Sequence, residues 1–420
     1  MRASSVRRHS SAARLGAHGR AKWDFGVASM RGRTMADGNA RIDIFARENF
    51  RGLYRPAAEA FSPPPWYYTS EEWFQAEVER IFRREWNCVG RVERVPNPGD
   101  YATFELAGHA LVLVHGRDGT IRAFHNHCRH RGARLLDGSG NCRAIVCPYH
   151  SWTYALDGTL AGAPYMEASR GFRQADHGLK PVRCEVSHGF VFVNLDPHGG
   201  SLADFLGDFG AVFQPYDLDN MVSVHRHEFE CACNWKASAE VFMEYYHTAS
   251  VHPLSLGTVK RSVNPPDDVR GSFATMFSDH VGTRALIAGH GHAAFPPIAT
   301  LTGRSKAGTR YSLLYPGMPL GLSIDAMWYI ECYPVSAGRT RYALNGCFPK
   351  TTIARADFKE KVGGYIERWE TAALEDNVAL ERQHKGFLSP HARPGRIQPA
   401  YESVVTQYGR WVVDRVIGNQ

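Results

Sequence analysis

The segment between residues 85 and 198 contains several short, apolar-rich runs with a period of two. Four of these runs are separated by polar intervals, namely "YATFEL" (101–106), "ALVLVH" (110–115), "IRAFHN" (121–126) and "GFVFVNL" (189–195). Alternation with a period of two sends successive side chains to opposite faces of a β-strand, and the pair Asp118-Gly119 suits a tight turn. The pattern predicts a small all-β domain over residues 85–198.

Apolar positions before this domain follow a helical period instead. In "TSEEWFQAEVERIFRREW" the residues Phe74, Val78 and Ile81 share one helical face. Thr69 and Glu72 are placed to form a capping box at the start of this helix. We therefore expect an amphipathic helix that packs against a larger domain.

The remainder of the chain, residues 199–420, combines strand-type runs with a long helical pattern. The strand-type runs cover residues 222–236, 326–335 and 340–349, and the helical pattern covers about 355–385. Such an order is typical of an α+β domain with an antiparallel sheet covered by helices. We expect residues 41–84 to belong to this second domain.

The net charge of the chain comes from its N-terminal tail. The formal net charge is +7, and residues 1–34 hold 8 Lys or Arg against a single acid, Asp24. Basic and acidic side chains balance in the rest, so the charge gives no indication of nucleic-acid binding. Residues 1–40 are expected to be a disordered basic tail. The tail is either an organelle transit peptide or an extension before a true start at Met35, and it lacks the apolar core of a secretory signal.

Cysteine content and hydropathy indicate the cellular compartment. The 9 cysteines are odd in number and scattered over 420 residues, which favours metal binding or core packing over disulfides. No apolar run in the sequence is long enough to cross a bilayer. We therefore expect a soluble, cytoplasmic protein without membrane contact.

Two short segments each offer one cysteine and one histidine, namely Cys128 with His130 in "CRHRG" and Cys147 with His150 in "CPYH". Zinc fingers commonly take two cysteines from one loop and two histidines from the other. A two-iron cluster with both thiolates on one iron and both imidazoles on the other needs one of each from each loop. Gly132 and Pro148 lie where such loops must turn tightly. A structural zinc knuckle remains the alternative.

A second group of candidate ligands lies in "NWKASAEVFMEYYHTASVHP", which contains His247 and His252. Their spacing puts both on one metal only if the helix breaks between them, and Pro253 fits a chain that leaves the helix there. A carboxylate from elsewhere would complete the two-histidine, one-carboxylate set that leaves positions open on a non-heme Fe(II). Asp376 and Glu375 in "WETAALEDNVALERQHKG" are competing candidates.

These segments resemble the large (α) subunits of the Rieske non-heme iron oxygenases, the ring-hydroxylating oxygenase family. The resemblance covers nearly the whole chain from about residue 60 and includes "FRREWNCVGRVERVPNPGDY", "GFVFVNLDP" and "NWK". It implies a Rieske domain whose [2Fe-2S] cluster is held by Cys128, His130, Cys147 and His150. It also implies a catalytic domain whose mononuclear Fe(II) is held by His247, His252 and Asp376, since the family takes its last ligand from the Asp of a C-terminal helix.

The resemblance further implies partners and a role for Glu244. In the family an acid at this place bridges to a cluster histidine of the neighbouring subunit, within a ring of three subunits, so a homotrimer is expected. Electrons are expected from a separate flavin/iron-sulfur reductase or ferredoxin fed by NADH or NADPH, because the chain shows no strand followed by Gly-x-Gly-x-x-Gly. O₂ and a small molecule are the expected substrates.

The substrate class is less strongly indicated. Most ring-hydroxylating dioxygenases have Asp where this chain has Glu244, whereas members that act on quaternary ammonium compounds often have Glu. This favours N-demethylation of a compound of the glycine betaine, stachydrine or carnitine type. Oxygenation of an aromatic ring or aromatic acid is the alternative, and a zinc-stabilised binding module without redox activity is the hypothesis from another class. Four aromatic residues are either core residues or a cage for a methylated ammonium group, namely Tyr245, Tyr246, Trp328 and Tyr329.

Overall fold

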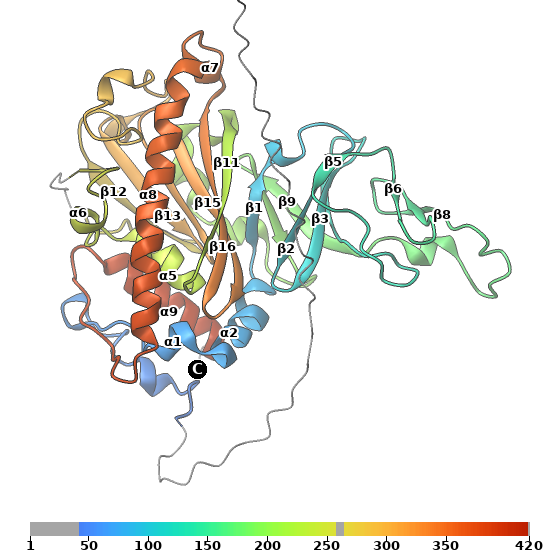
Figure 1. Cartoon of the computed structure of the whole chain (residues 1–420), viewed down its shortest axis with the longest axis horizontal. Coiled ribbons are helices and arrows are strands. Elements are labelled where there is room, and N and C mark those ends of the chain that lie inside the picture. Colours follow the sequence, from blue (N-terminus) through green and yellow to red (C-terminus); the bar gives the residue numbers. More distant parts are fainter. Residues whose placement is uncertain (1–41, 258–263, 419–420) are drawn as a thin grey trace, which may run out of the picture. The chain divides into compact units, whose positions relative to one another are not determined.

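Three antiparallel sheets form the framework of the chain (Figure 1). The structure is a computed structural model that describes residues 42–257 and 264–418. The expected basic tail lies outside the described residues. From Ile44 onward the described residues belong to one unit, and its mixture of sheets and helices confirms the predicted α+β class.

The predicted all-β region contains two of the sheets. The larger has seven strands in the order β1 (Asn87–Arg91), β10 (Phe190–Asn194), β9 (Pro181–Ser187), β4 (Ile121–His125), β3 (His109–His115), β2 (Asp100–Leu106) and β5 (Ser139–Asn141). The smaller has the order β6 (Ile145–Val146), β7 (Thr153–Tyr154) and β8 (Leu160–Gly162). The four alternating runs of the sequence correspond to β2, β3, β4 and β10, so these predictions are confirmed.

The third sheet has six strands in the order β11 (Met221–Cys231), β16 (Arg339–Pro349), β15 (Met327–Ser336), β14 (Met318–Leu322), β13 (Gly308–Leu314) and β12 (Phe273–Asp279). The strand-type runs predict β11, β15 and β16, but not β12, β13 and β14. Every residue of β13 and β14 is buried, because hydrophobic clusters cover both faces of this part of the sheet. A strand buried on both faces shows no alternation.

Nine α-helices occur in the described part of the chain: α1 (Trp66–Thr69), α2 (Glu71–Glu77), α3 (Leu202–Leu206), α4 (Phe209–Phe213), α5 (Trp235–Glu240), α6 (Thr248–Val251), α7 (Lys350–Ile353), α8 (Phe358–Phe387) and α9 (Ser403–Ile417). Helix α8 confirms the predicted helical region and crosses one face of the six-stranded sheet (Figure 1). The predicted capping box is wrong by one residue, because Ser70, rather than Thr69, caps α2 by accepting a hydrogen bond from the Trp73 amide.

The segment "NWK", which follows β11, joins α5 to α2. The strand predicted to continue to residue 236 ends at Cys231, since Asn234 caps α5 by accepting a hydrogen bond from the Lys236 amide. Trp235 donates to one carboxylate oxygen of Glu77, and the Lys236 ammonium lies 2.5 Å from the other. Glu77 and Lys236 are both fully buried. Their ion pair fixes the start of the segment that leads to His247.

Within the described ranges, every helix is too short or too polar to cross a membrane.

Candidate functional site

The two Cys/His segments form loops of the same shape. In each loop the cysteine carbonyl accepts a hydrogen bond from the amide four residues later, from Gly132 to Cys128 at 3.0 Å and from Ser151 to Cys147 at 3.1 Å. Gly132 and Ser151 have positive φ angles of 77° and 58°, which reverse the chain around the cysteine. The expected turns are confirmed, because Gly132 closes the first turn and Pro148 lies inside the second, which Ser151 closes.

The loops bring the predicted cluster ligands together. Cys128 and Cys147 are buried, while His130 is exposed. The Nδ1 atoms of His130 and His150 lie 3.2 Å apart. Two imidazole nitrogens that face each other in this way suit a shared metal ion. The donor set therefore fits a cluster with its thiolate side in the core and its imidazole side toward solvent.

Between α5 and α6 the chain leaves the helical conformation before the two histidines of the second group. Glu244 is extended, with φ −135° and ψ 154°. His247 and His252 then flank the single turn of α6, one at each end. The chain is thus non-helical at Glu244 and again at His252, where φ is −109° and ψ 51°, so it leaves the helix between the two histidines as expected. The four residues of α6 separate the histidines, and the non-helical conformation of His252 lets both imidazoles reach one point.

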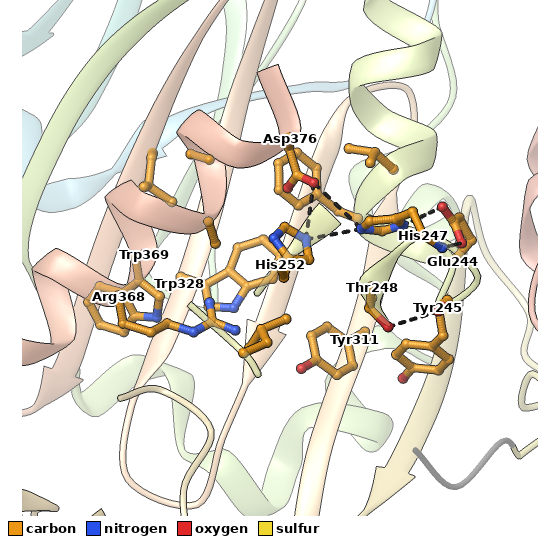
Figure 2. A pocket seen from close by; sticks show the side chains of 16 residues that line it. Glu244, Tyr245, His247, Thr248, His252, Tyr311, Trp328, Arg368, Trp369 and Asp376 are labelled. Carbon is orange, nitrogen blue, oxygen red and sulfur yellow. Dashed lines mark hydrogen bonds and ion pairs between the residues drawn. The ribbon is translucent and has the colours of Figure 1, made fainter. Parts of the chain in front are cut away.

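His247, His252 and Asp376 converge, and their ligand atoms lie within 4.8 Å of one another (Figure 2). The Nε2 atoms of the two histidines are 3.1 Å apart. The Oδ1 atom of Asp376, on α8, lies 3.5 Å from His247 Nε2 and 3.1 Å from His252 Nε2. This oxygen is buried and has no hydrogen-bond geometry to any described residue. A buried carboxylate oxygen facing two imidazole nitrogens fits a two-histidine, one-carboxylate metal site.

Glu375, the competing candidate, lies on the other side of His252. Its Oε2 atom is 2.9 Å from His252 Nδ1, and its carboxylate accepts hydrogen bonds from the Ser255 hydroxyl and the Leu254 amide. Burial acts to raise the pKa of Glu375, but these hydrogen bonds outweigh burial and lower it. An ionised Glu375 orients the ring of His252 so that Nε2 faces Asp376.

Glu244 acts on His247 in the same way. Its carboxylate contacts His247 Nδ1 and accepts hydrogen bonds from the amides of Tyr246 and His247. The second ring nitrogen, Nε2, is thereby directed toward Asp376 (Figure 2). Each histidine of the group is held at its outer nitrogen by a different glutamate, which is the arrangement that tunes metal-binding histidines.

An aromatic wall lines the cavity beside these three residues. Ring centroids lie 5.5 Å apart for Phe242 and Trp328, 6.3 Å for Trp328 and Tyr311, and 5.6 Å for Tyr311 and Tyr245. Tyr245 and Trp328 thus line the cavity as the cage hypothesis requires. Two other cage candidates do not line it, because Tyr246 is exposed and Tyr329 packs against Phe190 in a separate core cluster.

Sequence reasoning missed several lining residues, among them Tyr311, Arg368 and Trp369. Tyr311 lies on β13, where the buried polar residues Arg310 and Ser312 obscure the strand pattern. Arg368 and Trp369 lie on α8, two turns before Asp376, so the helical period of that segment is the signal that could have placed them beside the site. Figure 2 shows Arg368 and Trp369 at the side of the cavity opposite Glu244.

A second cavity lies on the other side of Glu244 and His247, which line both cavities. It is also lined by Tyr68, Glu240 and Glu402. Burial raises the pKa of Glu240 to about 8, although the Tyr68 hydroxyl donates hydrogen bonds to its carboxylate. Burial, followed by the nearby charge of Glu244, raises the pKa of Glu402. Acidic groups thus continue from the histidine site into this cavity.

Two family models match the chain. One, described as Rieske [2Fe-2S] domain, matches residues 85–181, and the other, described as Ring hydroxylating alpha subunit (catalytic domain), matches residues 218–418. The chain belongs to the ring-hydroxylating oxygenase α subunits. This confirms the resemblance seen in the sequence. As a member of this family the chain is an oxygenase whose cofactors are a Rieske [2Fe-2S] cluster and a mononuclear iron.

Curated relatives of this α subunit act in multi-component systems. The chain is 28% identical over 407 residues to the glycine betaine monooxygenase oxygenase subunit of Pseudomonas aeruginosa (strain UCBPP-PA14), with 89% of this chain and 93% of the relative covered. It is 39% identical over 222 residues to the carnitine monooxygenase oxygenase subunit of Escherichia coli (strain K12), with 51% and 58% covered. The α subunit is accordingly the oxygenase component of a system that needs a reductase.

Solved structures share the fold of the α subunit. A quaternary ammonium Rieske monooxygenase in complex with L-carnitine matches with a TM-score of 0.72 at 26% identity, covering 86% of this chain and 97% of the other. Naphthalene 1,2-dioxygenase with bound indole matches with a TM-score of 0.70 at 20% identity, covering 88% and 95%. The similarity to naphthalene 1,2-dioxygenase shows a shared fold and gives no information on the substrate.

Proposed function

We propose that Cys128, His130, Cys147 and His150 hold the [2Fe-2S] cluster and that His247, His252 and Asp376 hold the mononuclear iron. The facing Nδ1 atoms of the first histidine pair and the facing Nε2 atoms of the second support this assignment. The buried Oδ1 of Asp376 supplies the carboxylate ligand. An iron held by these three residues would supply the activation of O₂ that hydroxylation of a C–H bond needs.

The substrate we propose is a small betaine, which carries a quaternary ammonium group and a carboxylate. The observation that carries this proposal is the aromatic wall beside the proposed iron ligands, because aromatic ring faces attract a methylated ammonium group. Tyr311 and Trp328 are central in that wall. Among the described residues that line the cavity, Arg368 alone has a permanent positive charge. It is nearly buried, so its guanidinium is placed to pair with the carboxylate of the substrate.

The reaction that follows is oxidative N-demethylation. One oxygen atom of O₂ enters an N-methyl group, the other leaves as water, and NAD(P)H supplies two electrons through the reductase. The resulting N-hydroxymethyl group breaks down to a tertiary amine, formaldehyde and a proton. In this step the aromatic wall and Arg368 orient one methyl group toward Asp376 and the two histidines and keep water from the reacting carbon.

We further propose that three copies form a head-to-tail ring in which electrons cross between subunits near Glu244. The exposed imidazole side of the cluster site, with Tyr149 beside His150 at a ring-centroid distance of 3.7 Å, suits contact with a neighbour. Glu244 contacts His247 and also lines the second cavity. A neighbouring cluster histidine that reaches this cavity would connect through Glu244 to the iron ligand His247.

We also propose boundaries for the two domains and a cellular location for the protein. We propose that residues 85–198 form the Rieske domain and that residues 41–84 and 199–420 form the catalytic domain, because the buried pair of Glu77 and Lys236 joins the latter two segments. We propose a cytoplasmic location, because all nine cysteines are free of disulfides, as is usual in a reducing compartment.

The test of the proposed activity is a comparison of substrates with the reconstituted system. The purified α subunit, a Rieske-system reductase and NADH would be supplied with glycine betaine, carnitine, stachydrine, choline or benzoate, and formaldehyde and O₂ uptake measured together. We expect formaldehyde in a one-to-one ratio to O₂ with a betaine. O₂ uptake coupled to benzoate oxidation, without turnover of any betaine, would assign the enzyme to aromatic acids instead.

Substitution of Arg368 tests the proposed orientation of the substrate. Arg368→Gln is expected to raise KM for a betaine by about tenfold or more through loss of a charged hydrogen bond, and to leave KM for choline, which has no carboxylate, nearly unchanged. Arg382→Gln is the matched control, since Arg382 is exposed on the same helix. Equal losses for betaine and choline would show that Arg368 supports the fold and not the carboxylate.

A further inference from the structure

A second group of potential metal ligands lies on the edge of the six-stranded sheet. His225 and His227 are two residues apart on β11, the edge strand, so their side chains point to the same face. Helix α8 packs against this face, and its residue Glu370 reaches both histidines. Three side chains from two elements that are far apart in sequence thus meet at one point.

The geometry of the group suits a metal ion. The Oε1 atom of Glu370 lies 3.0 Å from His225 Nε2 and 2.5 Å from His227 Nδ1. One ligand atom from each residue falls within 4.8 Å of the other two. Two imidazoles and one carboxylate are a common protein ligand set for Zn²⁺, with a fourth position open to water. The side chains are 17%, 48% and 29% exposed for His225, His227 and Glu370, so an ion can enter from solvent.

A further observation separates this group from a simple ion pair. The Nε2 atom of His225 is buried, and despite its short distance from Glu370 it has no hydrogen-bond geometry to any described atom. A buried ring nitrogen that lies beside a carboxylate without an aligned hydrogen bond is unfavourable in the absence of a further partner. A cation placed between His225, His227 and Glu370 would use that nitrogen as a ligand.

We propose that His225, His227 and Glu370 form a second metal site, which binds Zn²⁺ or a similar divalent ion. This site is separate from the proposed iron site. Glu370 and Asp376 are six residues apart on α8, which places them about 120° apart around the helix axis and therefore on different faces. Asp376 faces the cavity with His247 and His252, while Glu370 faces β11.

The site acts as a clamp between β11 and α8. On the same face of α8, the carbonyl of Asn377 contacts Cys231 and the carboxylate of Glu381 accepts a hydrogen bond from the Ala232 amide. These contacts hold the C-terminal end of β11, whereas Glu370 holds its middle. A bound ion adds a rigid link at that point and so restrains the helix that carries Asp376 and Arg368. Binding to the folded chain only stabilises it by mass action.

The experiment measures zinc binding to the iron-loaded full chain. Equilibrium dialysis against Zn²⁺, with zinc and iron counted by mass spectrometry, is expected to show one zinc per chain gained without loss of iron. Glu370→Gln is expected to weaken this binding by at least about tenfold. Glu367→Gln, an exposed neighbour on the same helix, is the matched control and should bind zinc normally. Zinc bound equally by both variants, or gained only as iron is lost, would overturn the proposal.

Two further measurements keep the proposal testable if Glu370→Gln folds poorly. His227→Asn changes the most exposed ligand and is expected to lose zinc binding to the same extent. Zinc is also expected to raise the unfolding temperature of the wild-type chain and not that of the His227→Asn variant. Anomalous diffraction at the zinc edge would locate the ion, and a peak elsewhere, with none between β11 and α8, would contradict the site. None of these readouts depends on the oxygenase substrate.

Discussion

The adjacent acids Glu375 and Asp376 have different roles because they face opposite nitrogens of the same histidine. Asp376 lies at the Nε2 side of His252, where His247 also points, whereas Glu375 lies at the Nδ1 side. Their order along α8 alone does not separate a metal ligand from a residue that orients one. The atom of His252 that each carboxylate contacts distinguishes the two roles. Replacing Asp376 and replacing Glu375 should therefore affect metal binding differently.

Substitution of these two acids is therefore expected to affect iron differently. Asp376→Ala should abolish binding of the mononuclear iron and leave the cluster iron in place, because it removes one of the three proposed protein ligands. Glu375→Gln should retain the iron site but weaken its affinity by about 10- to 100-fold, as is typical when the partner of a metal-binding histidine is changed. Iron content and the EPR signal of the reduced cluster measure the two sites separately. Equal iron loss in both variants would remove the distinction.

Glu240 gives the stability of the protein a specific pH dependence. Its ordinary pKa is 4.5, and burial raises it to about 8 in the folded chain. Between these values the unfolded chain loses the proton while the folded chain keeps it, so the free energy of unfolding falls as pH rises through this range and levels off above it. Glu240→Gln is expected to remove this part of the decrease. Urea unfolding from pH 5 to pH 9 checks it, with the exposed Glu360→Gln as control.

At the scale of elements, the buried pair of Glu77 and Lys236 joins α2 to α5. Two indole groups, those of Trp73 and Trp235, also donate hydrogen bonds to Glu77, and the Lys236 ammonium lies 4.4 Å from the ring centroid of Tyr67. A buried charge is tolerated only when it is paired in this way. The pair thus determines where α5 starts and, through it, where His247 is placed.

Breaking this pair on one side is expected to be costly. Lys236→Met leaves Glu77 buried without its counter-charge, so the free energy of unfolding should fall by about 3–5 kcal/mol. Lys361→Met is the control, because Lys361 pairs with Asp357 at the surface and such pairs contribute about 1 kcal/mol or less. Urea unfolding at constant pH provides both values. A loss no larger than that of the control would show that the pair does not support α5.

Elements with a regular apolar pattern could be predicted from the sequence, and elements with an interrupted pattern could not. The patterns of β2, β3, β4 and β10 and the helical period of α8 were sufficient for prediction. Strands β12 and β13 were missed because buried polar residues such as Thr275 and Arg310 interrupt their apolar pattern, and β14 was missed because it contains Pro and Gly. Helix α9 was missed as well, although its buried residues include Val412 and Val416 at helical spacing.

Some residues of the candidate site could be predicted from their spacing in the sequence, whereas others could be recognised only in the folded structure. The Cys/His order was sufficient to propose the first group of ligands, because that chemistry is local in sequence. The partner of His247 and His252 required resemblance to choose Asp376, since Glu375 is one residue away and equally acidic. Tyr311 carries no local signal, and Arg368 has only the helical period of α8, because their place in the cavity depends on how β13 and α8 fold around it.

At the scale of the whole molecule, the exposed imidazole side of the cluster site is where we propose that electrons pass to a neighbouring subunit. Co-expression of a Cys128→Ser chain, which lacks the cluster, with an Asp376→Ala chain, which lacks the mononuclear iron, tests transfer between subunits. Each variant alone should be inactive. Mixed rings should regain activity, because in the proposed ring the cluster of one subunit serves the iron of the next. Mixed rings without activity, in protein shown to contain both chains, would place the transfer within one chain.

The most direct test of the account is a single turnover without a reductase. The α subunit, reduced with dithionite and freed of excess reductant, holds one electron in the cluster and one at the iron. Mixed with O₂ and glycine betaine or carnitine, it is expected to release up to about one formaldehyde per intact site, and Asp376→Ala is expected to release none. Reoxidation of the cluster by O₂ with no formaldehyde from any betaine would contradict the proposed N-demethylation.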